Sequence, residues 1–133
     1  MARSRPAAGE KPLHWAGSSK KDLLGFPGLV TRQIGIALGV VQRGGCPPSA
    51  KPWKGLGPGV LEIVEGDAAG TYRAVYTVRF AKAIYVLHAF QKKSPTGIRT
   101  ARTDIRLIEE RLKAARNDYE ERHGKEADHD RSR

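Results

Sequence analysis

The sequence predicts an α+β fold, in which a compact antiparallel sheet of about four strands carries two N-terminal helices and one C-terminal helix. The strongest observation is that residues 72–80 and 83–91 are both rich in Val, Ile, Tyr and Phe and are separated by only two residues. Such a short separation predicts a tight antiparallel hairpin. Apolar residues at helical spacing before and after this hairpin predict helices that pack against the sheet.

The length of 133 residues suits one domain with a single core, which we expect to span residues 11–124. A basic tail at 1–10 is expected to be disordered, and a charged tail at 125–133 is expected to be frayed. The net charge of +10 predicts an anionic partner, such as nucleic acid or an acidic protein. A membrane partner is not expected, because the longest apolar run, 34–41, is too short to span a bilayer.

The chain carries no motif for a cofactor. It has no His-Glu-x-x-His sequence, no Asp-rich loop and no glycine loop that leads from a strand into a helix, so we expect neither a metal site nor a nucleotide cofactor. Cys46 is the only cysteine, which excludes an internal disulfide. The first residues lack the apolar stretch of a secretory signal, and we therefore expect a cytoplasmic protein.

Residues 11–16 predict a first strand. Leu13 and Trp15 alternate with Pro12 and His14, as expected for a strand with one buried face. Because Pro12 cannot donate a ladder hydrogen bond, this strand is expected at an edge of the sheet.

Two helices are expected next. Ser18 is the expected N-cap of a short helix that runs to residue 24 and stops at Gly25. Pro27 can begin the second helix, and Gly44 with Gly45 ends it. Apolar residues recur at helical spacing in the second helix: Val30, Ile34, Ala37, Leu38 and Val41.

The remaining elements follow from composition. Residues 45–59, rich in Gly and Pro, predict a loop, and residues 60–65 predict a strand in which Glu62 faces away from its two neighbours. Residues 100–123 predict a long helix with one apolar stripe: Ala101, Ile105, Ile108, Leu112, Ala115 and Tyr119. If the helix pair covers one sheet face and this helix covers part of the other, a shallow cleft rimmed by Arg and Lys remains.

Arg73 is the first candidate for function. It lies near the start of a central strand, on the face of Val75 and Thr77, and the chain from 71 to 103 contains seven basic residues and no acidic one. A guanidinium on a rigid strand can bind a phosphate with two parallel hydrogen bonds and stabilise charge that develops at phosphorus. The alternative is a structural ion pair with Glu62 or Glu65.

The loop supplies further candidates. Lys51 and Lys54 flank Trp53, and a basic loop with an aromatic side chain suits phosphate contact and base stacking. The alternative for Trp53 is that it packs the loop against the core. Arg79 and Arg99 are expected to add nucleic-acid contacts.

His88, Lys92 and Lys93 lie on the last strand. Lys92 and Lys93 are consecutive, so only one of them can point into the cleft. Period-2 alternation places His88 on the face of Val86 and Phe90. A single histidine on a strand is more often a hydrogen-bonded core residue. If this face opens on the cleft, however, His88 could transfer protons near neutral pH.

Several of these segments together resemble a known family. Tyr72-Arg-Ala-Val-Tyr76 and Leu87-His-Ala-Phe-Gln-Lys-Lys93 are similar to the RelE/ParE toxin superfamily, and more narrowly to its phage-derived Gp49-like, HigB-type branch. The similarity extends to 15–23, 54–57 with 60–62, and the C-terminal helix. The resemblance implies a RelE-like fold.

The resemblance also implies an activity and partners. It implies the toxin of a type II toxin–antitoxin system, a metal-independent endoribonuclease that cuts mRNA at the ribosome through attack of the ribose 2′-OH. Its partner would be a helix-turn-helix, HigA-like antitoxin. By the same resemblance Arg73 would stabilise the phosphate, and Lys92 and Lys93 would correspond to the basic cluster. Some relatives carry Lys-x-Lys where this chain has Glu62-Ile-Val, so Glu62 or His88 would move the protons.

Two alternatives remain open from the sequence. The chain could be a ParE-like toxin that poisons DNA gyrase through protein contacts and catalyses no reaction. It could also be an inactive phage-derived protein that binds nucleic acid, with a salt dependence set by its phosphate contacts.

Overall fold

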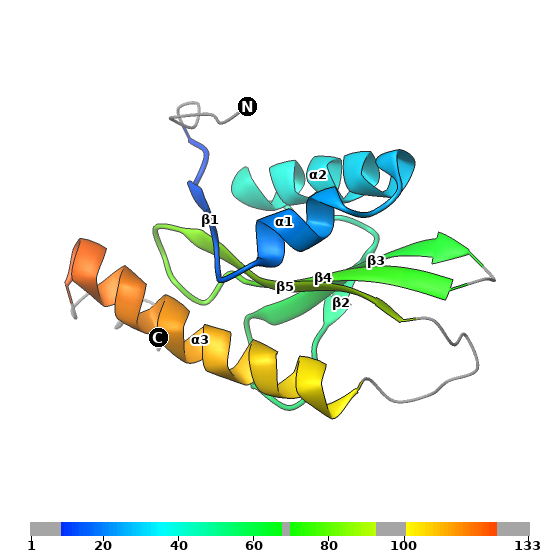
Figure 1. Ribbon diagram of the computed structural model, residues 1–133. Coiled ribbons are helices and arrows are strands. Elements are labelled where there is room, and N and C mark those ends of the chain that lie inside the picture. Colours follow the sequence, from blue (N-terminus) through cyan, green and yellow to red (C-terminus); the bar gives the residue numbers. More distant parts are fainter. Residues whose placement is uncertain (1–8, 68–69, 93–100, 125–133) are drawn as a thin grey trace.

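The computed structural model describes residues 9–67, 70–92 and 101–124 and confirms the α+β class (Figure 1). Five strands form one sheet in the order β1-β5-β4-β3-β2. The strands are β1 (Leu13–Trp15), β2 (Ala50–Pro52), β3 (Val60–Asp67), β4 (Gly70–Thr77) and β5 (Ile84–Lys92). The helices are α1 (Ser19–Leu24), α2 (Gly28–Gln42) and α3 (Arg102–His123). The tail predicted at 125–133, and that at 1–10 except residues 9 and 10, fall outside the described residues.

Helices cover both faces of the sheet, with α1 and α2 on one side and α3 on the other (Figure 1). One buried cluster lies under α1 and α2 and includes Leu23, Ile34, Leu38, Ile63 and Tyr76. A second lies under α3 and includes Val75, Phe80, Leu87, Ile108 and Tyr119. This is the predicted division of the helices between the two faces. No helix within the described ranges has the length and apolar character needed to cross a membrane.

The sheet differs from the prediction at both edges. β1 occupies an edge, as Pro12 indicated, but it pairs parallel with β5, so the sheet is mixed. β2 forms the other edge, antiparallel to β3, inside the segment predicted as a loop. Three residues ending in a proline carry too little β pattern to stand out from a Gly- and Pro-rich stretch.

The connection between β4 and β5 runs over 78–83 and is longer than the two residues predicted. At the end of β4, the Thr77 hydroxyl and the Val78 N–H both donate to the Gly59 carbonyl oxygen, at 2.7 and 2.9 Å. Phe80, predicted as the end of the strand, is fully buried and stacks on Tyr119, with ring centroids 4.9 Å apart. The connection is therefore part of the core beneath α3.

A β-bulge in β5 changes which side chains share a face. Val75 pairs with His88, but the next residue, Tyr76, pairs with Val86, so Leu87 is the extra residue. Val86 consequently joins the cluster under α1 and α2, whereas Leu87 joins the cluster under α3. The prediction that His88 shares the face of Val86 is therefore wrong, because strict alternation fails at a bulge.

Tyr85 and Asp118 link β5 to α3. The buried Tyr85 hydroxyl donates to Asp118 Oδ2 at 2.6 Å, and Arg122 Nε donates to the same oxygen at 2.7 Å. The hydrogen bond from Tyr85 is the main cause that lowers the pKa of the Asp118 carboxyl. A carboxyl whose folded pKa is lowered stabilises the fold above its unfolded pKa, near 3.8, and loses this contribution as the pH falls through the folded value.

We expect Tyr85→Phe to lower the free energy of unfolding by about 1 kcal/mol at pH 7, since a hydrogen bond to a carboxylate is lost. The difference from the parent should be smaller at pH 3, because below the unfolded pKa of 3.8 the unfolded chain gains a proton and the contribution of the lowered pKa diminishes. Urea denaturation at both pH values measures it. Tyr72→Phe, remote from Asp118, is the control, and a Tyr85→Phe difference that stays constant with pH contradicts the prediction.

Candidate functional site

A hollow of about 780 Å³ opens on the sheet face that α3 partly covers. Its walls come from β2 and the following loop, from single residues of β3, β4 and β5, and from α3. Six of the predicted site residues line it: Lys51, Trp53, Lys54, Glu62, Arg73 and Lys92. We call this site the Arg73 hollow. It lies where the sequence predicted a cleft rimmed by Arg and Lys.

Arg73 and Glu62 form an ion pair at the edge of the hollow. Arg73 Nη1 donates to Glu62 Oε1 at 2.9 Å, and Arg73 Nε donates to Thr71 Oγ1 at 3.2 Å. The pair is diagonal, because Arg73 stands opposite Val64 on β3 and Glu62 stands opposite Val75 on β4. The two side chains are 14% and 9% exposed. These contacts use two of the five N–H donors of the guanidinium, so Arg73 is both paired and accessible from the hollow.

The lining has an excess of positive charge. Among the described lining residues, Arg73 and three lysines face two carboxylates, those of Glu62 and Glu109. Lys51 and Lys54 are exposed and Lys92 is half-buried. A concave surface with this balance attracts anions. Within the described part of the chain, no group of three His, Cys, Asp or Glu side chains could hold a metal ion.

Trp53 serves the core and the hollow together. It packs against the buried cluster under α3 and also lines the hollow. The structure therefore confirms that Trp53 packs the loop against the core, whereas base stacking by Trp53 stays a prediction. An aromatic side chain fixed by the core and open on one side can stack a nucleic-acid base at little cost in conformational entropy.

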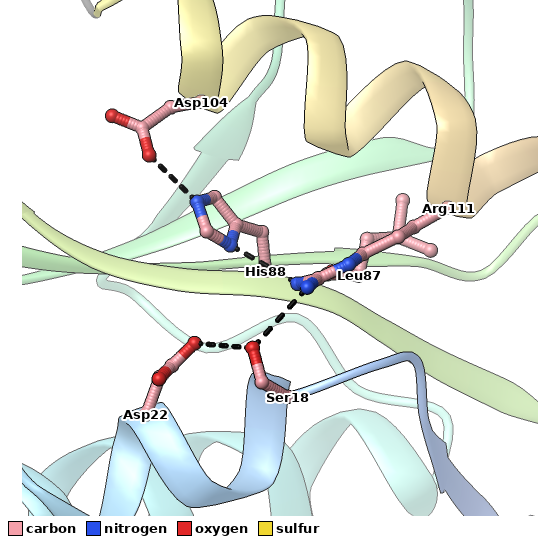
Figure 2. Close-up of polar contacts among 6 residues, drawn as sticks. All are labelled: Ser18, Asp22, Leu87, His88, Asp104 and Arg111. Atoms are coloured by element: carbon pink, nitrogen blue, oxygen red, sulfur yellow. Dashed lines mark hydrogen bonds and ion pairs between the residues drawn. The ribbon is translucent and has the colours of Figure 1, made fainter.

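His88 lies outside the hollow, buried between β5 and α3 (Figure 2). Its Nε2 lies 2.7 Å from Asp104 Oδ1, and its Nδ1 lies 3.2 Å from Nη1 of Arg111. A guanidinium can only donate, so Nδ1 accepts, and the tautomer with hydrogen on Nε2 satisfies both contacts. The ring also stacks on Phe90, with centroids 5.1 Å apart. His88 is therefore a hydrogen-bonded core residue, which is the more frequent of the two roles considered for it from the sequence.

Arg111 extends this network from α3 across β5 to α1 (Figure 2). It donates to the carbonyl oxygen of the bulged Leu87 at 3.1 Å and to Ser18 Oγ at 3.2 Å, and Ser18 Oγ donates to Asp22 at 2.8 Å. Ser18 occupies the predicted N-cap position before α1, but its side chain bonds the side chains of Asp22 and Arg111 and makes no capping hydrogen bond. The network connects the N-terminal helix, the bulge and the C-terminal helix.

The other predicted residues have separate places. Arg79 is bonded to carbonyl oxygens of the loop before β3 and does not line the hollow. Lys93 and Arg99 lie outside the described residues. Five lining residues were not predicted as site residues. Three belong to β2 and the loop after it, namely Pro52, Gly55 and Leu56, and the other two, Ile105 and Glu109, lie on α3. Ile105 and Glu109 are four residues apart and therefore lie on one helix face. The sequence placed Ile105 in the apolar stripe of this helix, but its side chain is 37% exposed in the structure. The same spacing could have predicted Glu109 as its neighbour in the hollow.

The chain is similar to one family of known proteins. Residues 21–113, more than half of its length, match the family model described as phage derived protein Gp49-like (DUF891). No curated protein and no solved structure matches the chain.

Proposed function

Because the chain belongs to the Gp49-like family of phage-derived proteins (DUF891), we propose that it is the toxin of a type II toxin–antitoxin system and that it cleaves mRNA in the Arg73 hollow. The observation that carries the proposal is the position of Arg73. Its guanidinium is held on a central strand by Glu62 and borders a hollow with three lysines and an aromatic wall. Such a set of groups suits a phosphodiester flanked by unpaired bases.

The proposed reaction needs no group beyond these side chains. The ribose 2′-oxygen attacks the adjacent phosphorus while its proton passes to the Glu62 carboxylate, and the bond from phosphorus to the 5′-oxygen breaks. The products are a 2′,3′-cyclic phosphate and a 5′-hydroxyl, whose proton comes from the Lys92 ammonium. Arg73 donates hydrogen bonds to the phosphate oxygens as negative charge builds up on them. Glu62 and Arg73 already share a hydrogen bond, so base and phosphate site are adjacent.

The remaining lining residues would bind the substrate. Lys51 and Lys54 at the rim are placed to contact neighbouring phosphates, and Trp53 to stack a base. The net charge of +10 favours approach to the ribosome, which is rich in RNA phosphate. It equally favours an acidic surface on a helix-turn-helix, HigA-like antitoxin that would inhibit the protein in the cytoplasm.

The proposal is tested by inducible expression in a bacterial host, with mRNA 5′ ends mapped before and after induction. We expect growth arrest together with new mRNA ends, and rescue when the neighbouring open reading frame is expressed as well. Arrest with a DNA-damage response and no new ends would contradict cleavage and indicate gyrase as the target. Continued growth would contradict the toxin assignment and leave a nucleic-acid-binding protein.

His88 is expected to matter for stability and not for cleavage. His88→Ala should lower the free energy of unfolding by about 2 kcal/mol, because the partly buried Asp104 and Arg111 lose a hydrogen-bond partner. Cleavage per folded molecule should remain near the parent value, since His88 lies outside the hollow. Urea denaturation and cleavage of a purified RNA measure the two effects, and a large loss of cleavage by a fully folded His88→Ala protein would contradict this assignment.

A further inference from the structure

The loop that contains Trp53 and Lys54 borders the Arg73 hollow, and fixing its backbone in one conformation is costly in conformational entropy. Residues 53–59, which we call the Gly-rich loop, contain three glycines with positive φ, namely Gly55 at 105°, Gly57 at 84° and Gly59 at 88°. Glycine loses more conformational freedom on folding than any other residue. A loop of this composition needs contacts that hold it in one conformation.

The segment after β4 supplies these contacts through Arg79. The guanidinium donates from Nε to the Pro58 carbonyl oxygen at 3.2 Å, and from Nη2 to the same oxygen at 2.9 Å and to the Leu56 carbonyl oxygen. The Arg79 N–H donates to Thr77 Oγ1 at 3.0 Å, and Thr77 in turn donates to the Gly59 carbonyl oxygen. One arginine thus holds two carbonyl groups that lie two residues apart in the loop.

The glycines fit closely around this arginine. A Cβ atom on Gly59 would lie 3.4 Å from the Arg79 Cα, and a Cβ atom on Gly57 would lie 3.4 Å from Nη2. Leu56, whose carbonyl oxygen Arg79 binds, is itself part of the wall of the Arg73 hollow, two residues after Lys54. The hydrogen bonds of Arg79 therefore fix the position of this part of the wall.

We propose that Arg79 is a positioning residue for RNA binding, which acts by holding the Gly-rich loop so that Lys54 faces the Arg73 hollow. The inference rests on the proposed function and replaces direct phosphate contact as the role of Arg79. The two roles differ in what they require of the side chain. Holding two carbonyl groups requires the planar fork of arginine, whereas a phosphate contact can be made by any cation at that place.

Arg79→Lys separates these roles because it keeps the charge and removes the fork. The probe is a 2′-O-methyl oligoribonucleotide, which lacks the nucleophile and cannot be cleaved, with binding measured by fluorescence anisotropy. We expect about tenfold weaker binding for Arg79→Lys and Arg79→Ala alike, the order of one lost charge-assisted contact. Lys20→Ala, which removes a charge from α1 on the opposite sheet face, should bind like the parent. Parent-like binding by Arg79→Lys with loss in Arg79→Ala overturns the proposal.

A double-mutant cycle tests whether Arg79 acts through Lys54. In a Lys54→Ala background, Arg79→Lys should weaken binding by a clearly smaller factor than in the parent, because both changes affect one loop contact. Equal factors in the two backgrounds would mean that the residues act independently, and the positioning role would then be wrong.

A measurement without RNA keeps this inference separate from the proposed function. Trypsin can cut the Lys54–Gly55 bond when the Gly-rich loop opens, and Arg79→Lys preserves a tryptic site at its own position. We expect about tenfold faster cutting at Lys54–Gly55 in Arg79→Lys than in the parent, and an unchanged rate in Lys20→Ala. An equal rate in the parent and Arg79→Lys overturns the positioning role. A parent that binds no RNA contradicts the proposed function instead.

Discussion

Glu62→Gln should reduce the rate of RNA cleavage by about 10²–10⁴-fold, the contribution of a well-placed general base. The amide oxygen can still accept the hydrogen bond that Arg73 donates, at 2.9 Å in the parent, so the geometry of the pair is kept. The amide cannot take the 2′-hydroxyl proton. The effect should appear in kcat, measured with a purified oligoribonucleotide, and less in KM, because the phosphate contacts remain.

Glu65→Gln is the matched control for this change. Glu65 stands on the same strand as Glu62 but lines a different hollow, next to α2, and its substitution alters the net charge equally. Glu62→Gln also leaves Arg73 without its carboxylate. We expect this to lower the free energy of unfolding by about 1–2 kcal/mol, less than for a sealed ion pair because the guanidinium borders the open hollow. If Glu62→Gln cleaves RNA as fast as Glu65→Gln, Glu62 is not the base.

Arg73→Lys should reduce cleavage by about 10²–10³-fold, the usual effect of removing a donor aimed at developing negative charge. Lysine keeps a cation beside Glu62 but cannot present two parallel N–H groups to a phosphate. Growth arrest on induction should be lost as well. Arg32→Lys on α2, an exposed arginine on the opposite sheet face, is the matched control.

Lysine is a better test at this position than alanine. Arg73→Ala would leave the Glu62 carboxylate, 9% exposed, without a cation, and breaking a buried pair in this way costs about 3–5 kcal/mol. The resulting unfolding would be mistaken for lost catalysis. Thermal unfolding of Arg73→Lys close to that of the parent, together with lost cleavage, supports the proposed role, and parent-like cleavage and toxicity would contradict it.

The ion pair gives Arg73 two roles in one arrangement. A guanidinium sealed in the core and bonded to a carboxylate could not reach a phosphate, and the proposal would then fail. The structure shows the bond to Glu62, but it also shows both side chains at the surface of a 780 Å³ hollow. We infer that Glu62 orients the guanidinium and lowers the conformational freedom that substrate binding would otherwise have to remove.

Patterns within the sequence were sufficient to predict the helices, most of the strands and six of the residues that line the hollow. Apolar spacing and glycine positions act over a few residues, so the predicted helices nearly coincide with α1, α2 and α3. Strand alternation placed Arg73 on the face of Val75 and Glu62 on the face opposite to its two neighbours, and in the structure both border the hollow on the face that α3 partly covers. Strand β2 was not predicted, because its three residues carry too little β pattern.

Only the tertiary structure decided what each charged side chain contacts. His88 contacts Asp104 and Arg111 of α3, which follow it by 16 and 23 residues, and the bulge at Leu87 moves Val86 to the opposite face of the sheet. The longer connection lets Arg79 reach carbonyl groups 21 to 23 residues before it. The diagonal pairing of Arg73 with Glu62 depends on the register between β3 and β4. Register, bulges and loop contacts are set by packing between distant segments, and local residue patterns do not encode them. The sequence alone therefore determined which residue types gather on this face, and the folded chain determined which of them border the hollow.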